Sequence, residues 1–101
     1  MSKIAVLAKL TTKAGSRAEV IEILTAQVAA ITDEEGTEVY ALHTDDGDEV
    51  TVWFYERYAD AASLDRHGKT ELMAALGPKL AGKMAARPEI IRLTPVVAKG
   101  L

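Results

Sequence analysis

Three side chains in this 101-residue chain are suited to proton chemistry: Glu56, Tyr58 and His67. Glu56 and Tyr58 occur in the segment VTVWFYERY, whose alternation would place them on one face of a strand with Val52 and Phe54. A carboxylate in such apolar surroundings can titrate high, which would suit Glu56 to general base catalysis. The alternative is a glutamate at the end of a sheet that meets solvent, an arginine or a backbone amide.

The two histidines differ in their predicted surroundings. His67 follows Leu64 by three residues in a predicted helix, so both side chains would lean toward the sheet. Because imidazole titrates near neutral pH, His67 could carry a proton or donate a hydrogen bond to a ligand. It could equally be a partly exposed or structurally bonded imidazole. His43 lies near a predicted turn and is interpreted as structural or solvated.

Several other chemistries are not indicated. The chain has no cysteine, which excludes disulfides, thiolate nucleophiles and iron–sulfur clusters. Its seven glycines are scattered and form no phosphate-binding loop, and its two histidines lack the spacing of metal ligands. Ser16 and Ser63 are predicted to start helices, which disfavours a serine hydrolase. We therefore expect neither a metal nor a cofactor.

The composition is typical of one globular domain over residues 1–101, with 49% apolar and 27% charged residues. Twelve Lys and Arg against fifteen Asp and Glu give a net charge of 12 − 15 = −3. Without a stripe of positive charge, nucleic acid is not an expected partner. Lys9 interrupts the apolar N-terminal run, so neither a signal peptide nor a membrane span is predicted, and a cytoplasmic location is expected.

The periodicity of the apolar residues predicts four strands, over residues 3–11, 37–44, 49–58 and 89–99. Together with two helical regions they give the order β-α-β-β-α-β. This order predicts an α+β, ferredoxin-like fold, in which an antiparallel four-stranded sheet carries the helices on one face. Strands 3–11 and 49–58 are apolar on both sides, so we expect a second subunit to cover the other face and form a homodimer.

Helix starts and breaks are predicted from short motifs. Ser16 and Glu19 have the spacing of a capping box at the start of the first helix. Asp60 is the expected cap of the second helical region, which Gly68 and Gly77-Pro78 should bend or divide.

The pair Asp46-Gly47 between two strands predicts a hairpin with a two-residue type I′ loop. With that loop, Val39 would lie opposite Phe54. Tyr40 would then fall on the other face, with Trp53, where packing at a subunit interface is expected.

The segment VWFYERYADAASLDRH resembles the signature of the antibiotic biosynthesis monooxygenase domain family. In that family a Glu-x-aromatic strand end is followed by an Asp, an Ala-Leu helix turn and a His. The matching residues here are Glu56, Tyr58, Asp60, Leu64 and His67. Upstream, residues 13–15 are similar to the family's Lys-Pro-Gly turn, and residues 35–40 to its Glu-x-Gly stretch that leads to a tyrosine.

The resemblance implies a dimeric α+β barrel, in which two ferredoxin-like subunits place their sheets face to face and the C-terminal strand reaches the partner. It also implies a cofactor-independent monooxygenase that oxidises a small aromatic quinol or phenolic metabolite with molecular oxygen. The substrate itself would reduce oxygen in a dry pocket. The implied roles are stacking for Phe54, a phenolic hydrogen bond for Tyr58 and proton acceptance or orientation for His67. Val52, Glu56 and Leu64 are the other expected substrate-binding residues.

Two other functions stay open. A non-catalytic dimer that binds a small apolar ligand is one, because some active members have an Asn and a Trp where this chain has Phe54 and Tyr58. An isomerase or decarboxylase of the same barrel type is the other, with Glu56 or His67 as a base that acts without oxygen. Haem cleavage is disfavoured, because Leu72 and Met73 stand where the haem-degrading branch has its histidine.

Overall fold

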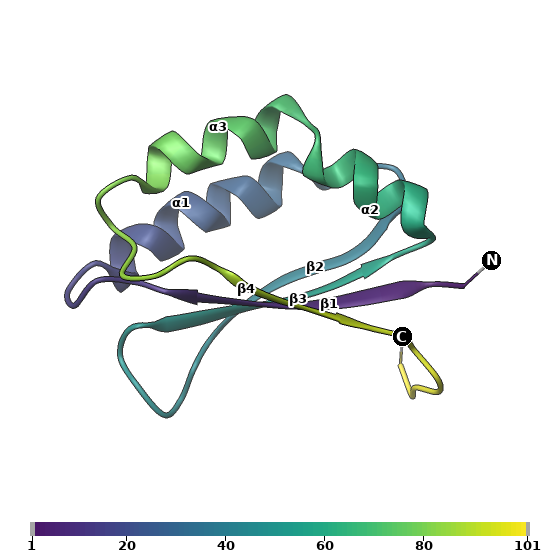
Figure 1. Ribbon diagram of the computed structural model, residues 1–101, viewed down its shortest axis with the longest axis horizontal. Coiled ribbons are helices and arrows are strands. Elements are labelled where there is room, and N and C mark those ends of the chain that lie inside the picture. The colour runs from purple at the N-terminus through teal and green to yellow at the C-terminus, as the bar shows by residue number, and fades with distance from the viewer. Residues whose placement is uncertain (1, 101) are drawn as a thin grey trace.

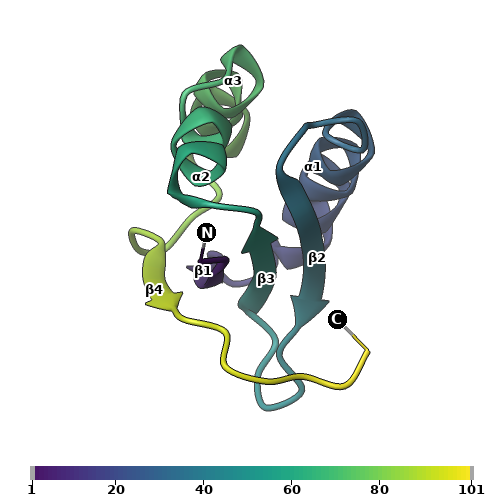
Figure 2. The same cartoon turned by 90° about the vertical axis from the view of Figure 1, so that its right-hand side faces the viewer.

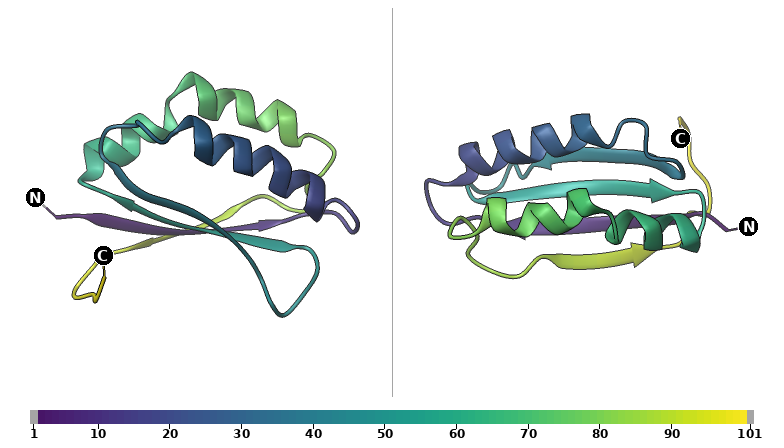
Figure 3. Two further views of the ribbon diagram at one scale, coloured as in Figure 1. Left: turned by 180° about the vertical axis from the view of Figure 1, so that it is seen from behind. Right: turned by 90° about the horizontal axis from the view of Figure 1, so that it is seen from above.

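The chain folds into one four-stranded antiparallel sheet with every helix over the same face, as the computed structural model of residues 2–100 shows (Figure 1). The strands are β1 (Ile4–Thr11), β2 (Thr37–Thr44), β3 (Thr51–Tyr58) and β4 (Glu89–Leu93). The helices are α1 (Arg17–Ala30), α2 (Ala61–Gly68) and α3 (Glu71–Leu80). The strand order is β2-β3-β1-β4, and the views from behind and above show the helical layer covering the sheet (Figure 3). The predicted ferredoxin-like fold is confirmed.

Strand β3 turns every second side chain toward the helices. These inner-face side chains are at most 7% exposed: Val52, Phe54, Glu56 and Tyr58. The residues between Val52 and Tyr58 alternate with them and are half-buried on the outer face. The alternation within β3 is therefore as predicted, and it brings Phe54 into a core with β1, α1 and α3.

The pairing of β2 with β3 differs from the prediction. Leu42 lies opposite Phe54, and Tyr40 lies opposite Glu56. The expected pairing of Val39 with Phe54 is wrong. Because successive side chains alternate between the two faces, this change moves Tyr40 to the inner face of the sheet.

The cause is a longer hairpin loop, in which Gly47 does not adopt a positive φ and no type I′ turn forms. Side-chain acceptors organise the loop instead. The Asp45 carboxylate accepts a hydrogen bond from the Gly47 amide at 2.7 Å, and the Asp48 carboxylate accepts one from the Thr51 amide at 2.7 Å. These aspartate bonds order residues 46–50, beyond the last backbone hydrogen bond of the hairpin, which runs from the Asp45 amide to the Thr51 carbonyl at 3.1 Å.

The helix caps are partly as predicted. Asp60 caps α2 and accepts from the amide of Ser63 at 2.8 Å, and the second helical region divides after Gly68, with Thr70 capping α3. The predicted capping box at Ser16 is wrong, because Ser16 already has helical φ and ψ of −98° and −8° and makes no side-chain cap bond.

Strand β4 ends at Leu93, earlier than the predicted boundary at residue 99. Pro95 follows two residues later and has no amide hydrogen to continue the ladder. Figure 2 shows the following segment running from β4 toward the β2 side, on the face of the sheet away from the helices. Its side chains of Val96 and Val97 are 92% and 90% exposed.

Candidate functional site

A cavity of about 370 Å³ lies between the inner face of the sheet and the helices. Most of its lining is apolar and includes Leu24, Phe54, Leu64, Met73, Leu76 and Leu80. Its polar and charged side chains are those of Tyr40, Glu56, His67 and Arg92. An apolar pocket with a few convergent polar groups is the usual form of a small-molecule site.

The strand register explains why the polar groups gather toward one end of this cavity. One row across the inner face, from β2 to β4, consists of Tyr40, Glu56, Val6 and Arg92. The next row on the same face is entirely apolar: Leu42, Phe54, Ala8 and Ile90. The cavity floor therefore has a polar end and an apolar end.

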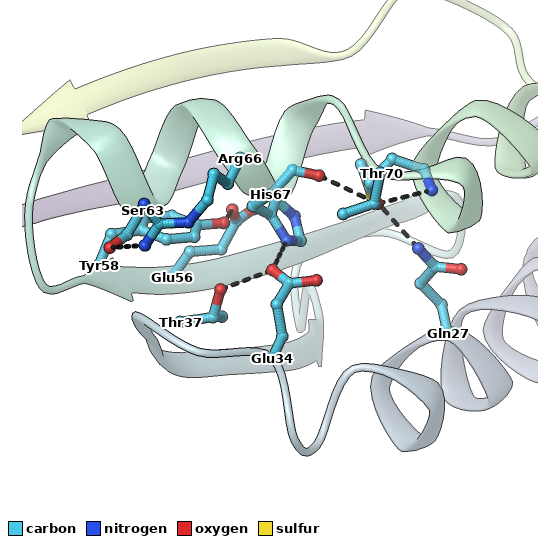
Figure 4. A network of polar contacts seen from close by, with 10 residues as sticks. Gln27, Glu34, Thr37, Glu56, Tyr58, Ser63, Arg66, His67 and Thr70 are labelled. Carbon is cyan, nitrogen blue, oxygen red and sulfur yellow. Dashed lines mark hydrogen bonds and ion pairs between the residues drawn. The ribbon is translucent and has the colours of Figure 1, made fainter.

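His67 joins α2 to the loop that precedes β2, and its side chain is buried (Figure 4). Its Nδ1 lies 2.5 Å from Oε1 of Glu34, and the Thr37 hydroxyl donates to the same oxygen at 2.7 Å. A proton on Nδ1 satisfies this carboxylate. With the proton on Nδ1, the other ring nitrogen, Nε2, is the one able to accept a proton. Nε2 makes no hydrogen bond within residues 2–100.

Glu56 and Tyr58 form a second buried polar pair beside the histidine. The Tyr58 hydroxyl donates to the Glu56 carboxylate, and the Tyr58 ring lies 5.4 Å from the His67 ring between centroids. Burial raises the pKa of Glu56, and burial together with the bond to Glu56 raises the pKa of Tyr58. Both groups are therefore favoured in their uncharged forms relative to the same side chains in water.

Tyr40 is a site residue that sequence reasoning missed. Its ring stacks on Phe54, with centroids 4.4 Å apart and planes at 19°, and meets the edge of His67 at 5.0 Å. Burial is the main reason that the pKa of the Tyr40 phenol is raised. It was missed because the predicted hairpin register placed Tyr40 on the outer face of the sheet.

Glu34 is a second site residue that was not predicted, because the resemblance to the Glu-x-Gly stretch was placed on residues 35–40. The signal that could have identified Glu34 is the Glu-x-Gly spacing, which begins at that residue.

Four of the six predicted site residues line the cavity: Phe54, Glu56, Leu64 and His67. Val52 is packed in the core, and Tyr58 lies behind Glu56, so neither of these two reaches the cavity. Among residues 2–100, no cluster of three or more His, Asp or Glu could hold a metal ion. In the same part of the chain, no helix combines the length and apolar character needed to cross a membrane.

A second hollow, of about 610 Å³, lies between α1 and the edge strand β2. It is larger than the inner cavity, but among residues 2–100 the ionisable side chains that line it are those of Tyr40 and His43 alone. His43 is exposed, and its Nδ1 lies 3.1 Å from the carbonyl of Ala41. We therefore assign the candidate chemistry to the inner cavity.

Comparison with known proteins gives one family and several similar structures. The model of a family described as antibiotic biosynthesis monooxygenase matches residues 3–77. A solved structure from Caulobacter crescentus, named for the same family, is 29% identical, with a TM-score of 0.89 over 95% of this chain and 92% of its own. The Pseudomonas aeruginosa protein PA3566 is 25% identical, with a TM-score of 0.87 over 96% of this chain and 97% of its own. A search of curated protein sequences finds no match.

Proposed function

Because the chain belongs to the antibiotic biosynthesis monooxygenase family, we propose that it is a cofactor-independent monooxygenase of a small aromatic quinol or phenol. The observation that carries this proposal is the buried imidazole of His67 at the polar end of an otherwise apolar cavity, with Glu34 on its Nδ1. We expect the reaction to take place in the cytoplasm, since a chain without cysteine gains nothing from an oxidising compartment.

In the proposed reaction His67 starts the chemistry by accepting a proton from a substrate hydroxyl at Nε2. The Glu34 carboxylate orients the ring and stabilises the resulting imidazolium, as the aspartate does in a serine protease. The electron-rich aromatic anion then reduces molecular oxygen. One oxygen atom bonds to a ring carbon while the O–O bond and the C–H bond of that carbon break. The other oxygen atom leaves as water, with the proton returned by His67 and the hydrogen displaced from the ring carbon. A hydroquinone and O₂ thus give a hydroxyquinone and water.

The surroundings of His67 suit this chemistry. The stacked rings of Phe54 and Tyr40 offer an aromatic surface for the substrate ring. The apolar walls offer water few hydrogen-bond partners, which disfavours solvation of the anion beside His67.

The test is oxygen uptake during aerobic incubation with a panel of hydroquinones and naphthohydroquinones. We expect at least one member to be oxidised well above its spontaneous rate, with a hydroxyquinone as product. No acceleration over the whole panel would contradict the proposal. Binding without turnover would support the non-catalytic alternative, and turnover under anaerobic conditions would support an isomerase or decarboxylase that uses Glu56 or His67 as base.

We further propose that a second copy of the chain covers the outer face of the sheet. Leu7, Trp53 and Tyr55 line a hollow on this face together with His43, and Leu93 nearby is 40% exposed. Exposed apolar surface of this kind favours burial against a partner. Sedimentation equilibrium is expected to give twice the chain mass of 10.8 kDa, and a mass of one chain at micromolar concentration would contradict the dimer.

A further inference from the structure

We infer that the ligand of the inner cavity carries a carboxylate, which Arg92 binds, at the end of its aromatic body opposite the hydroxyl that meets His67. The inference rests on the proposed function in taking the ligand to be a hydroxyaromatic molecule. It adds a second recognition point, on β4, and thereby a chemical class of substrate: small hydroxyaromatic acids.

Arg92 stands on the inner face of β4, in the same row as Val6 of β1, and its side chain lines the cavity. Arg92 is exposed to solvent, and β4 is an edge strand of the sheet. Arg92 therefore lies at the rim of the cavity, where the cavity meets solvent. No hydrogen bond or ion pair within residues 2–100 engages its guanidinium group. The acidic residue of this strand, Glu89, pairs instead with Lys9 on the outer face.

The carboxylate of Glu56 does not neutralise Arg92. The two residues belong to the same row but are separated by Val6, which places their backbones two strand spacings, or roughly 10 Å, apart. Tyr58 donates to Glu56, and burial already favours its uncharged form. Among the side chains of residues 2–100, none therefore supplies a counter-charge to this permanently charged guanidinium at the cavity.

The two strand spacings from Glu56 to Arg92 are about the length of a one- or two-ring aromatic molecule. His67 lies over the β2–β3 end of this row, because its ring meets those of Tyr40 and Tyr58. Its ring system would lie over Val6 and the adjacent apolar row, where Ala8 and Ile90 line the cavity. A hydroxyl at one end would reach His67 on the β2 side, and a carboxylate at the other end would reach Arg92. A guanidinium binds a carboxylate through two parallel hydrogen bonds, which a neutral group cannot accept as strongly.

Two probes that differ only in the carboxylate test this inference: 6-hydroxy-2-naphthoic acid and 2-naphthol. Isothermal titration calorimetry is expected to show that the intact chain binds the acid roughly tenfold or more tightly than the naphthol, because charge-assisted hydrogen bonds are the strong ones. The Arg92→Gln variant should bind both probes with similar affinity. Arg92→Lys, which keeps the charge but not the two-point geometry, should retain part of the preference.

The matched control is Arg87→Gln, which removes an exposed arginine just before β4 that does not line the cavity. It should keep the full preference for the acid. Equal affinities in the unmodified chain, failure of both probes to bind, or an unchanged preference in Arg92→Gln would each overturn the inference.

This binding test is independent of oxidation, because neither probe is a hydroquinone. A preference for the acid in a protein that oxidises no quinol would leave the inference standing and contradict the proposed function. Oxidation of neutral quinols by a protein that shows no preference for the acid would support the proposed function and overturn the inference about Arg92.

Discussion

A His67→Gln variant is expected to lose roughly 10²- to 10³-fold in kcat, because a positioned general base contributes about 10²–10⁴-fold to a rate. The glutamine amide can still donate to Glu34 as Nδ1 does, and it fills similar space in a position that is 4% exposed. It cannot accept a proton near neutral pH. The change therefore removes the proposed base while it preserves the packing, and KM should alter little. The measurement is oxygen uptake with the naphthohydroquinone that the unmodified chain oxidises fastest.

The control for this variant is His43→Gln, which changes the only other histidine of the chain. His43 is exposed on β2 and does not line the inner cavity, so its replacement should leave kcat unchanged. If His67→Gln kept the full rate while its far-ultraviolet circular dichroism stayed the same, His67 would not be the base, and the proposed mechanism would be wrong.

Glu34 acts through His67, as a positioning residue. Removing such a partner of a functional side chain commonly costs about 10- to 100-fold. Glu34→Gln should therefore lower kcat by roughly tenfold with little change in KM. Glu35→Gln, at the neighbouring exposed position, should have no effect. A purely structural role for Glu34 would instead lower thermal stability and leave kcat of the folded enzyme unchanged.

Features of the fold that depend on neighbouring residues could be predicted from the sequence. The alternation of Val52, Phe54, Glu56 and Tyr58 follows from strand geometry, and each of these side chains faces inward. The Asp60 cap follows from a side chain that reaches an amide three residues ahead. Such local rules turn Phe54 and Glu56 of β3 toward the helices and His67 of α2 toward the sheet, and all three line the cavity.

The hairpin shows where local rules are insufficient. Asp46-Gly47 favours a tight turn, but Asp45 and Asp48 on either side offer carboxylates that bind the loop amides. These bonds stabilise a longer loop, and the competition between the two arrangements depends on side-chain geometry that the pattern does not contain. Because the side-chain period of a strand is two, the change in register reversed the face assigned to Tyr40.

Contacts between distant segments could not be predicted at all. Glu34 and His67 are 33 residues apart, and they meet only because α2 packs over the loop before β2. Arg92 enters the cavity lining because β4 pairs with β1 in the register that sets it beside Val6. No local pattern around Glu34 or Arg92 indicates which distant residues it will meet. Their places in the site could therefore be found only from the tertiary structure.

The loop that carries Glu34 depends on Gly36, and Gly36→Ala is expected to lower the free energy of unfolding by about 3 kcal/mol. Gly36 has a φ of +85°, which an alanine adopts only with strain. An added Cβ would also lie 2.1 Å from Oγ of Ser63. Ser63 cannot move cheaply, because its hydroxyl donates to Asp60 at 2.7 Å and accepts from Arg66 at 3.1 Å. The Gly36 carbonyl, moreover, accepts from the amide of Ala59 at 2.9 Å, which fixes the loop against the end of β3.

Gly15→Ala separates the backbone strain from the steric clash. Gly15 has nearly the same φ, +82°, but an added Cβ there would have no atom within 4 Å. It should lose only the backbone contribution, about 1 kcal/mol. Urea unfolding of both variants gives the steric contribution by difference, and a Gly36→Ala, Ser63→Ala double variant should recover part of it. Equal losses in the two single variants would show that Ser63 yields freely. In that case α2 would not hold the loop rigidly, and the position of Glu34 beside His67 would not be fixed by this contact.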